Sequence, residues 1–249
     1  MNRWIAAYRR IVRAAAPDLW WNRRFVRRAL TGFRPRVCLD LGAGSAPLEA
    51  TVRQCVPAVR YWKTDLPPAF EQDWAADAAR LPLRRESVDL ALMMELLAHL
   101  PEPDQALAEA RRVLTPGGRL LVSYRFLHGE CALHDYHRWT HEGMTARLAR
   151  AGFRILDHRR QGGLFFALTQ GLAGVVPSLI PGMRGGWRSR RDGWGALRLA
   201  TLVLLQLPFQ LLGFVALALD RLLPLKGFYS GGMVLAEKPD DGAAGGNHG

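Results

Sequence analysis

The sequence predicts an α/β fold in which helices cover both faces of a mostly parallel sheet, and three observations lead to this prediction. Apolar segments of strand length alternate with helix-like segments between residues 36 and 160. The first apolar segment ends in two closely spaced glycines, Gly42 and Gly44. The second ends in an acid, Asp65, about 20 residues further on. Strands that alternate with helices in this way pair in parallel through crossover connections.

The first strand is expected at 36–41, where a short apolar run lies between Pro35 and Gly42. Such a run is typical of a strand that is buried on both faces. Gly42 and Gly44 carry no Cβ, so the chain can turn tightly there and bring its backbone against a ligand. A strand followed by a glycine turn and a helix is how α/β sheets bind a nucleotide-like group at the carboxyl edge.

The spacing of the glycines disfavours a dinucleotide such as NAD. The dinucleotide fingerprint requires a third glycine at position 47, where this chain has Pro47. A second strand is expected at 59–64, and Asp65 closes it. A carboxylate in that place accepts hydrogen bonds from ribose hydroxyls.

The remaining elements follow the same alternation. Asp89 is expected to play a structural role as the acid that starts the fourth strand, and Thr140 to cap a helix over Glu142–Ala151. The further strands are expected at 73–76, 87–93, 118–125, Phe153–Arg160 and Tyr229–Glu237.

Five segments together resemble class I S-adenosylmethionine-dependent methyltransferases, in particular the type 11-like family of small-molecule and lipid methyltransferases. The resemblance covers residues 36–160. Two positions depart from the family pattern: Ala46 stands where the glycine motif has its last glycine, and Ala98 where a glutamate usually precedes the histidine. The matching segments are Asp40-x-Gly42-x-Gly44, 75–83 (AADAARLPL), 86–92 (ESVDLAL), 94–100 (MELLAHL) and 110–118 (ARRVLTPGG).

This resemblance implies a Rossmann-like sheet of seven strands, with the last strand antiparallel beside the fifth, and S-adenosylmethionine as the cofactor. In the family, Asp40 lies near the methionine amino group, Asp65 on the ribose and Asp77 near the adenine amine. A helix N-cap before Ala78 is the alternative role for Asp77. The expected cofactor residues are Asp40, Gly42, Gly44, Asp65, Asp77 and Glu95.

Methyl transfer is an in-line displacement that depends on positioning, and a general base is needed only if the acceptor is still protonated. The expected catalytic residues are His134, Asp135 and His137, in the loop after the fifth strand together with His128, Glu130 and Tyr136. Residues 134–140 (HDYHRWT) resemble a segment of bacterial methyltransferases. His99 is expected to pack at a helix start, with general base as the alternative. No metal is expected, because His134 and His137 lack two further ligands at a zinc-binding spacing.

The net charge of +12 is carried almost wholly by arginine, which suits either nucleic acid or an anionic membrane surface. The three cysteines show no disulfide or metal spacing, which predicts a reduced, cytosolic setting. The N-terminus lacks the apolar region of a signal peptide. Residues 1–35 are expected to form two basic helices broken near Pro17, which either cap the sheet or lie on anionic lipid or over the substrate.

Residues 161–228 form an apolar and basic insertion into the domain of 36–160 and 229–238, and 239–249 form a disordered tail. Gln161–Met183 and Leu199–Leu219 carry no charged side chain, and each is long enough to span a bilayer. A single crossing is excluded because both flanking strands belong to one sheet. The arginines between the two stretches oppose a hairpin. We therefore expect helices that lie peripherally on the cytoplasmic face of the inner membrane, with a soluble lid or dimer contact and a hairpin as alternatives.

Together these features predict O-methylation of a lipid-linked, glycan or other amphiphilic small-molecule acceptor at the cytoplasmic membrane face. A nucleic-acid methyltransferase is the alternative that the charge suggests. Residues 93–96 (MMEL), however, lack the Asn/Asp-Pro-Pro-aromatic motif of nucleobase amino methylation, so no nucleic-acid partner is expected. A non-catalytic scaffold is a further alternative, which retention of the acids and glycines disfavours.

Overall fold

The computed structural model describes residues 16–66, 72–129, 134–175, 195–225 and 227–240. The chain divides into two units, which are described separately. The sheet unit combines Asn22–Arg125, Tyr136–Arg160 and Gly231–Gly249. The helix-pair unit combines Met1–Trp21, Phe126–Asp135 and Gln161–Ser230.

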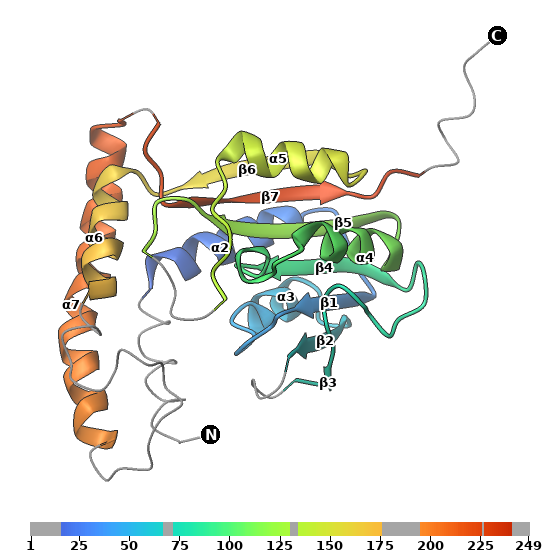
Figure 1. Ribbon diagram of the computed structural model, residues 1–249, viewed down its shortest axis with the longest axis horizontal. Helices are drawn as coiled ribbons and strands as arrows, with labels where there is room; N and C mark the ends of the chain where they lie inside the picture. The colour runs from blue at the N-terminus through green and yellow to red at the C-terminus, as the bar shows by residue number, and fades with distance from the viewer. Residues whose placement is uncertain (1–15, 67–71, 130–133, 176–194, 226, 241–249) are drawn as a thin grey trace. The chain divides into compact units, whose positions relative to one another are not determined.

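Seven strands form one sheet in the order β3-β2-β1-β4-β5-β7-β6 (Figure 1). Neighbouring strands from β3 to β5 pair in parallel, whereas β7 pairs antiparallel with β5. The α/β fold class, with its seven mostly parallel strands and antiparallel last strand, is therefore confirmed. The strands are β1 (Val37–Leu41), β2 (Arg60–Asp65), β3 (Trp74–Ala75), β4 (Val88–Met94), β5 (Leu114–Arg125), β6 (Arg154–Gln161) and β7 (Gly231–Glu237).

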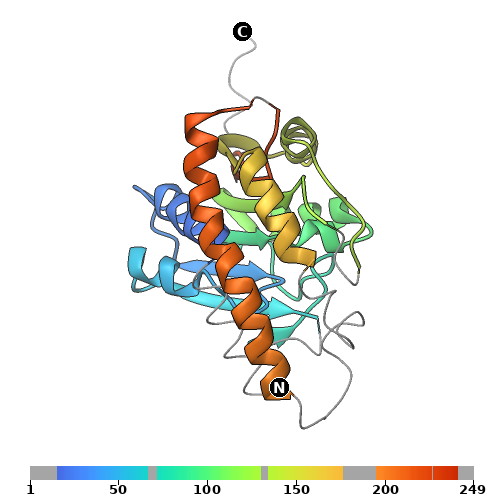
Figure 2. The ribbon, with the colours of Figure 1, turned by 90° about the vertical axis from the view of Figure 1, so that its left-hand side faces the viewer.

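The middle of the sheet is covered on both faces. Every residue of β1 is buried, as its continuous apolar run predicts. Figure 2 shows α3 (Glu49–Cys55) on one side of the sheet, and α4 (Pro103–Val113) and α5 (His141–Arg150) on the other. The buried leucines and valines of β4 and β5 form the core between these layers.

Local sequence signals place several residues correctly. The Asp89 carboxylate accepts hydrogen bonds from the backbone N–H groups of Arg36 (2.8 Å) and Val37 (2.9 Å), which confirms its structural role. The Thr140 hydroxyl accepts the N–H of Gly143 at 3.0 Å and so caps α5, as predicted.

Two expected strand boundaries are wrong. β5 begins at Leu114 rather than 118, because Leu114 pairs with Val88 and a register irregularity follows that pair. β3 is only two residues long, since it pairs with only the last two residues of β2. Two basic helices were expected on either side of a break near Pro17, and the second of them is α2 (Pro17–Ala29). The first was expected in residues 1–15, which lie outside the described residues, as do residues 241–249.

In the helix-pair unit, α6 (Leu164–Val175) and α7 (Gly195–Leu222) lie side by side (Figures 1 and 2). Asp220 of α7 accepts hydrogen bonds from the N–H groups of Gly163 (2.8 Å), Phe165 (2.9 Å) and Phe166 (3.1 Å). Phe166 also packs with Ala216 and Leu217 of α7 in a small apolar core. Among the helices within the described ranges, none has the length and apolar character needed to cross a membrane.

Candidate cofactor site

The predicted cofactor residues lie at the carboxyl ends of four adjacent parallel strands. In the order of the sheet, Asp77 follows β3, Asp65 ends β2, the glycine turn follows β1, and Glu95 follows β4. The chain passes from β1 to β2 on one side and later to β4 on the other, so the strand order reverses at β1. Ligands of open α/β sheets bind outside the carboxyl ends at such a reversal.

The turn after β1 needs residues without a large side chain. Gly42 and Gly44 have positive φ values of 63° and 54°, which favour glycine. A Cβ on Gly42 would lie 2.6 Å from Cδ1 of Leu96, so any larger residue there would also displace the Leu96 side chain. The backbone of Ala46 is also in the left-handed region, with a φ of 45°. This explains physically why the related motif has a glycine where this chain has Ala46.

Asp65 joins the glycine turn to the end of β2. One carboxylate oxygen accepts the N–H of Gly44 at 2.9 Å, and the other accepts the N–H of Leu66 at 2.8 Å. A carboxylate oxygen has two lone pairs, so each oxygen retains one acceptor position. Asp65 thus shapes the turn and keeps the capacity to accept two hydroxyl hydrogens.

Asp40 is buried within the sheet, with only 2% of its surface exposed. The Tyr61 hydroxyl donates a hydrogen bond of 2.6 Å to its carboxylate. Burial raises the pKa of Asp40 from 3.8 to about 7, although the Tyr61 hydrogen bond acts in the opposite direction. The sequence alone did not indicate Tyr61. Tyr61 lies opposite Cys38 in the parallel register of β1 and β2, and Asp40 is two residues further along β1.

Glu95 is held in a strained backbone conformation, with φ of 59°. Its carboxylate accepts hydrogen bonds from Ser123 Oγ at 2.9 Å and from Arg125 Nε at 2.5 Å. Its backbone N–H donates to the same Ser123 hydroxyl at 2.8 Å. Sequence reasoning did not single out Ser123 or Arg125, because their place beside Glu95 depends on the register of β4 and β5.

Asp77 lies in a turn that follows β3. One of its carboxylate oxygens accepts the N–H of Ala79 at 2.9 Å, and its backbone carbonyl accepts the N–H of Arg80 at 2.9 Å. The alternative role as a helix N-cap is wrong, because this segment forms a turn and no helix starts there. The side chain is exposed, so its second oxygen is accessible from solvent.

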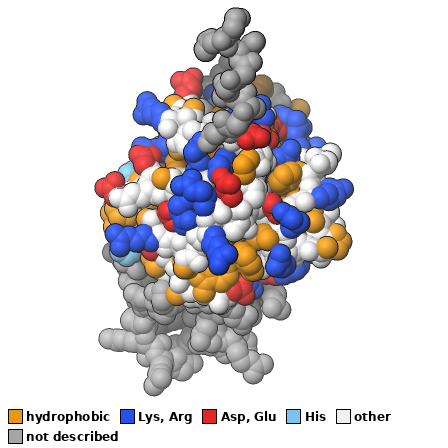
Figure 3. Space-filling view, turned by 90° about the vertical axis from the view of Figure 1, so that its right-hand side faces the viewer, with side chains coloured by type: hydrophobic (Ala, Val, Ile, Leu, Met, Phe, Trp, Pro, Cys, Tyr) orange, Lys and Arg blue, Asp and Glu red, His pale blue; other side chains and the backbone are white. Residues whose placement is uncertain are grey.

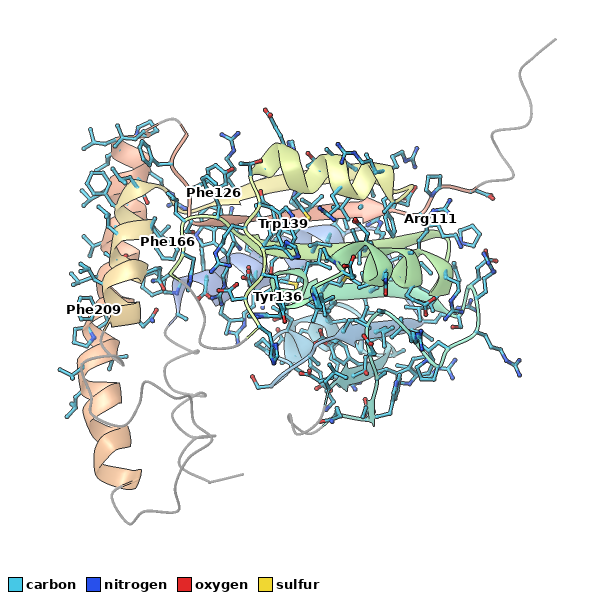
Figure 4. All side chains as sticks on the ribbon, viewed as in Figure 1. Arg111, Phe126, Tyr136, Trp139, Phe166 and Phe209 are labelled. Carbon is cyan, nitrogen blue, oxygen red and sulfur yellow. The ribbon has the colours of Figure 1, made fainter. Side chains whose placement is uncertain are left out.

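Within the sheet unit, the residues that lead into α5 pack against the segment after β4. The N–H of Tyr136 donates to the carbonyl of Ala98 at 2.8 Å, and His137 Nε2 lies 3.3 Å from the carbonyl oxygen of Pro101. The His137 ring also stacks on Trp139, with 5.2 Å between ring centroids. Figure 4 shows Tyr136 and Trp139 among these residues.

Of the three predicted catalytic residues, only His137 belongs to the sheet unit with the cofactor residues. His134, which has a φ of 53°, and Asp135 belong to the helix-pair unit. Glu130 lies outside the described residues. His99 ends η1 (Leu97–His99), a short helix after β4. Within the described ranges, no cluster of three histidine, cysteine or acidic side chains could hold a metal ion.

The donor and acceptor set fits a positively charged nucleoside cofactor. Asp65 and Asp77 offer carboxylate oxygens to hydroxyl or amine hydrogens at the ends of neighbouring strands. Asp40 and Glu95 supply further acidic groups on the next two strands. A cofactor with an anionic pyrophosphate would meet these carboxylates with like charge, which is unfavourable.

A family model described as "Methyltransferase domain" matches residues 39–122. A malonyl-(acyl-carrier protein) O-methyltransferase from Geobacter sulfurreducens is 30% identical over 161 residues, which cover 51% of this chain and 58% of that protein. The ubiquinone/menaquinone biosynthesis C-methyltransferase UbiE of Acidiphilium cryptum is 40% identical over 76 residues, 30% of each protein. The chain spans between 17% and 58% of the length of the curated relatives it matches.

Solved structures with the same fold have diverse chemistry. The cyclase SpnF aligns with a TM-score of 0.55 and 18% identity, over 83% of this chain and 76% of that one. The 1,6-didemethyltoxoflavin-N1-methyltransferase of Burkholderia thailandensis, solved with S-adenosylhomocysteine, aligns with a TM-score of 0.54 and 18% identity, over 88% and 77%. At this identity the likeness establishes the fold alone.

Proposed function

Since this chain belongs to the class I S-adenosylmethionine-dependent methyltransferases, we propose that it transfers the cofactor's methyl group to an amphiphilic small-molecule acceptor. The observation that carries this proposal is the row of carboxylates and glycines across four adjacent strand ends. Bound S-adenosylmethionine supplies an activated methyl group on a positively charged sulfonium.

The proposed cofactor contacts follow from the acceptor positions that the side chains retain. Asp65 has one acceptor position left on each oxygen, which suits the two ribose hydroxyls. Asp77 is exposed at the next strand end and suits the adenine amine. Gly42 and Gly44 leave the turn after β1 free of side chains, so its backbone can approach the cofactor. Asp40 is buried against Tyr61 and Glu95 is paired with Arg125, so we assign both the role of shaping this edge of the sheet.

We assign the acceptor atom as oxygen and the base to the loop of His134, Asp135 and His137. Of these residues, His137 belongs to the sheet unit, where the backbone bond from Tyr136 to Ala98 holds the adjoining residue against the segment that follows Glu95. A neutral histidine suits proton abstraction from a hydroxyl near pH 7. Several curated relatives are O-methyltransferases, including three that act on malonyl-(acyl-carrier protein), and their names support oxygen as the acceptor atom.

The membrane part of the proposal rests on the helix-pair unit considered by itself. Exposed apolar side chains on α7 recur at helical spacing and form one stripe, here called the α7 stripe: Leu204, Leu211, Val215, Leu219 and Leu222. Leu168 and Leu172 add a second exposed pair one turn apart on α6. Contiguous apolar surface of this kind marks an interaction site. The arginines of the sequence between the helices favour an anionic lipid surface as the partner.

Cofactor binding and methyl transfer are tested in two successive experiments. Calorimetry with S-adenosylmethionine and S-adenosylhomocysteine should give saturable binding of both. Incubation of the protein and S-adenosylmethionine with bacterial lipid and glycan extracts should then yield a species heavier by one methyl group in mass spectrometry. A folded protein that binds neither compound would refute the proposal.

Membrane association is tested by sedimentation with phosphatidylglycerol vesicles. The variant L204E/L222E changes two side chains that are 73% and 75% exposed, so the fold should be retained. We expect this variant to lose most of its sedimentation. The control is Leu156→Glu, which places the same charge at an exposed leucine of β6. Equal sedimentation of both variants and the unaltered chain would contradict the lipid role of the α7 stripe.

A further inference from the structure

The sheet unit contains a cavity at the edge opposite the predicted cofactor residues. The cavity has a volume of about 640 Å³, within the usual range for small-ligand pockets of roughly 300–1,000 Å³. Its lining comes from the loop before β4, from α4 between Asp104 and Arg112, and from the end of α5. Figure 3 shows the corresponding face, where arginine and lysine side chains gather near the middle, and Figure 4 labels Arg111 at this end of the sheet.

The position of the cavity follows from the strand directions. Arg85 lies just before β4, and Arg112 just before β5, so the cavity borders the amino ends of these strands. The predicted cofactor residues lie at the carboxyl ends. A strand of seven residues such as β4 is about 20 Å long, so the two regions share no residue.

The lining is strongly basic. Five arginines and two acids line the cavity, which leaves a surplus of three positive charges. These charges come from three separate elements and converge on one concave surface, as expected of a site that receives a compact anion. The lining consists of Arg85, Asp104, Ala108, Glu109, Arg111, Arg112, Arg147, Arg150 and Ala151.

Part of this lining is fixed by the fold. Arg112 donates to the Glu109 carboxylate at 2.7 and 2.9 Å and to the carbonyls of Leu83 (2.8 Å) and Leu81 (3.0 Å). Arg147 pairs with Asp104 at 2.6 Å. These bonds hold the walls in place, and they commit most of the donors of Arg112 to structural contacts.

Two arginines are available to a ligand. Within the part of the chain that the structure describes, the side chains of Arg85 and Arg150 make no hydrogen bond or ion pair, and both residues are exposed. Arg147 uses one terminal nitrogen for Asp104, which leaves donors on the other. Guanidinium groups bind phosphate oxygens through paired N–H donors, and their charge is always present.

We propose that this cavity, here called the arginine cavity, binds a small phosphorylated ligand that carries a diphosphate group. The ligand would be held by Arg85, Arg147 and Arg150 at a site separate from the cofactor crevice. A diphosphate carries two to three negative charges, which match the surplus of the lining. The concave lining and a volume in the range of small-ligand pockets favour a small molecule as the occupant. The proposal is independent of methyl transfer.

The test is calorimetry on the full chain, in the presence of S-adenosylmethionine, with inorganic pyrophosphate, ADP and citrate as probes at constant ionic strength. We expect pyrophosphate and ADP to bind in a saturable manner and citrate at least tenfold more weakly. The variant R85Q/R150Q should weaken pyrophosphate binding at least tenfold. The matched control is Arg84→Gln, because Arg84 is exposed beside Arg85 but does not line the cavity.

Several outcomes would overturn the proposal. These are an absence of saturable pyrophosphate and ADP binding, citrate binding as tight as pyrophosphate binding, and an equal loss of affinity in R84Q. A lipid source is distinguished with phosphatidic acid vesicles. If R85Q/R150Q abolishes vesicle binding while free pyrophosphate does not bind at all, the cavity recognises a lipid headgroup and the small-ligand assignment is wrong. Unchanged thermal unfolding of the variants excludes a folding defect as the cause.

Discussion

Replacement of Asp65 by alanine separates the structural role of this carboxylate from its proposed role in cofactor binding. In the structure, Asp65 accepts one part-buried N–H, from Gly44, and one exposed N–H, from Leu66. Water replaces the exposed bond, so only the bond from Gly44 contributes substantially, with about 1.5 kcal/mol for a charged acceptor. We expect a fall of about 3–6 °C in the thermal midpoint without cofactor, since 1 kcal/mol corresponds to roughly 2–4 °C for a chain of this size.

The cofactor contribution adds to this structural effect. Loss of the bonds to the ribose hydroxyls should cost about 1.5–3 kcal/mol, which raises the dissociation constant of S-adenosylmethionine roughly tenfold to 150-fold. Calorimetry below the unfolding temperature measures this change. The matched control is Asp73→Ala, because Asp73 also accepts a backbone N–H, that of Lys63 at 2.7 Å, but is not a proposed cofactor residue. Unaltered affinity in Asp65→Ala, or a loss no greater than in Asp73→Ala, would refute the ribose role.

Three further predictions concern strain, capping and ionisation. Ala46→Gly should stabilise the protein by up to about 1 kcal/mol in chemical denaturation, because relief of the left-handed conformation exceeds the entropy cost of glycine; a loss of stability would contradict the strain. Asp220→Ala should cost about 2–3 kcal/mol and speed amide exchange at the first turn of α6, whose N–H groups lose their acceptor; unchanged exchange there would contradict the capping role. The folded-state pKa of Asp40, about 7 against 3.8, means that folding favours its protonated form, so its stabilising contribution is present below pH 4 and is lost as pH rises through 7. The unfolding free energy of Asp40→Asn minus that of the unaltered chain should therefore rise by at most about 4 kcal/mol between pH 4 and pH 8. A difference that stays constant across that range would show that the pKa of the Asp40 carboxyl is not perturbed.

The sequence predicts what depends on neighbours along the chain. The apolar run of β1, the acid at the end of β2 and the Thr140 cap are each encoded within a few residues. The partners of the site acids are encoded differently. Tyr61 reaches Asp40 from the neighbouring strand, and Arg125 reaches Glu95 from 30 positions away along the chain. Such pairs depend on strand register, which local periodicity does not determine.

The insertion illustrates the same limit. Its two apolar stretches were predictable from length and composition, and α6 and α7 fall within them in large part. The contact that joins the two helices was not predictable, because Asp220 caps α6 from 57 positions further along the chain than Gly163. A lone acid in an apolar helix has no local feature that reveals its acceptor role.

Backbone strain gives an independent reason to regard the carboxyl edge as functional. Among the described residues, four that are not glycine have a positive φ: Ala46, Glu86, Glu95 and His134. Ala46 belongs to the turn after β1 and Glu95 follows β4, both at the carboxyl edge, whereas Glu86 precedes β4 and His134 belongs to the helix-pair unit. Each such conformation costs on the order of 1–3 kcal/mol and persists only when the surrounding structure enforces it. At Glu95 the enforcing contacts are visible, since Ser123 and Arg125 hold both carboxylate oxygens. A chain selected only for stability would relieve this strain, for example with glycine at position 46, so its retention beside the glycine turn favours a site kept for binding.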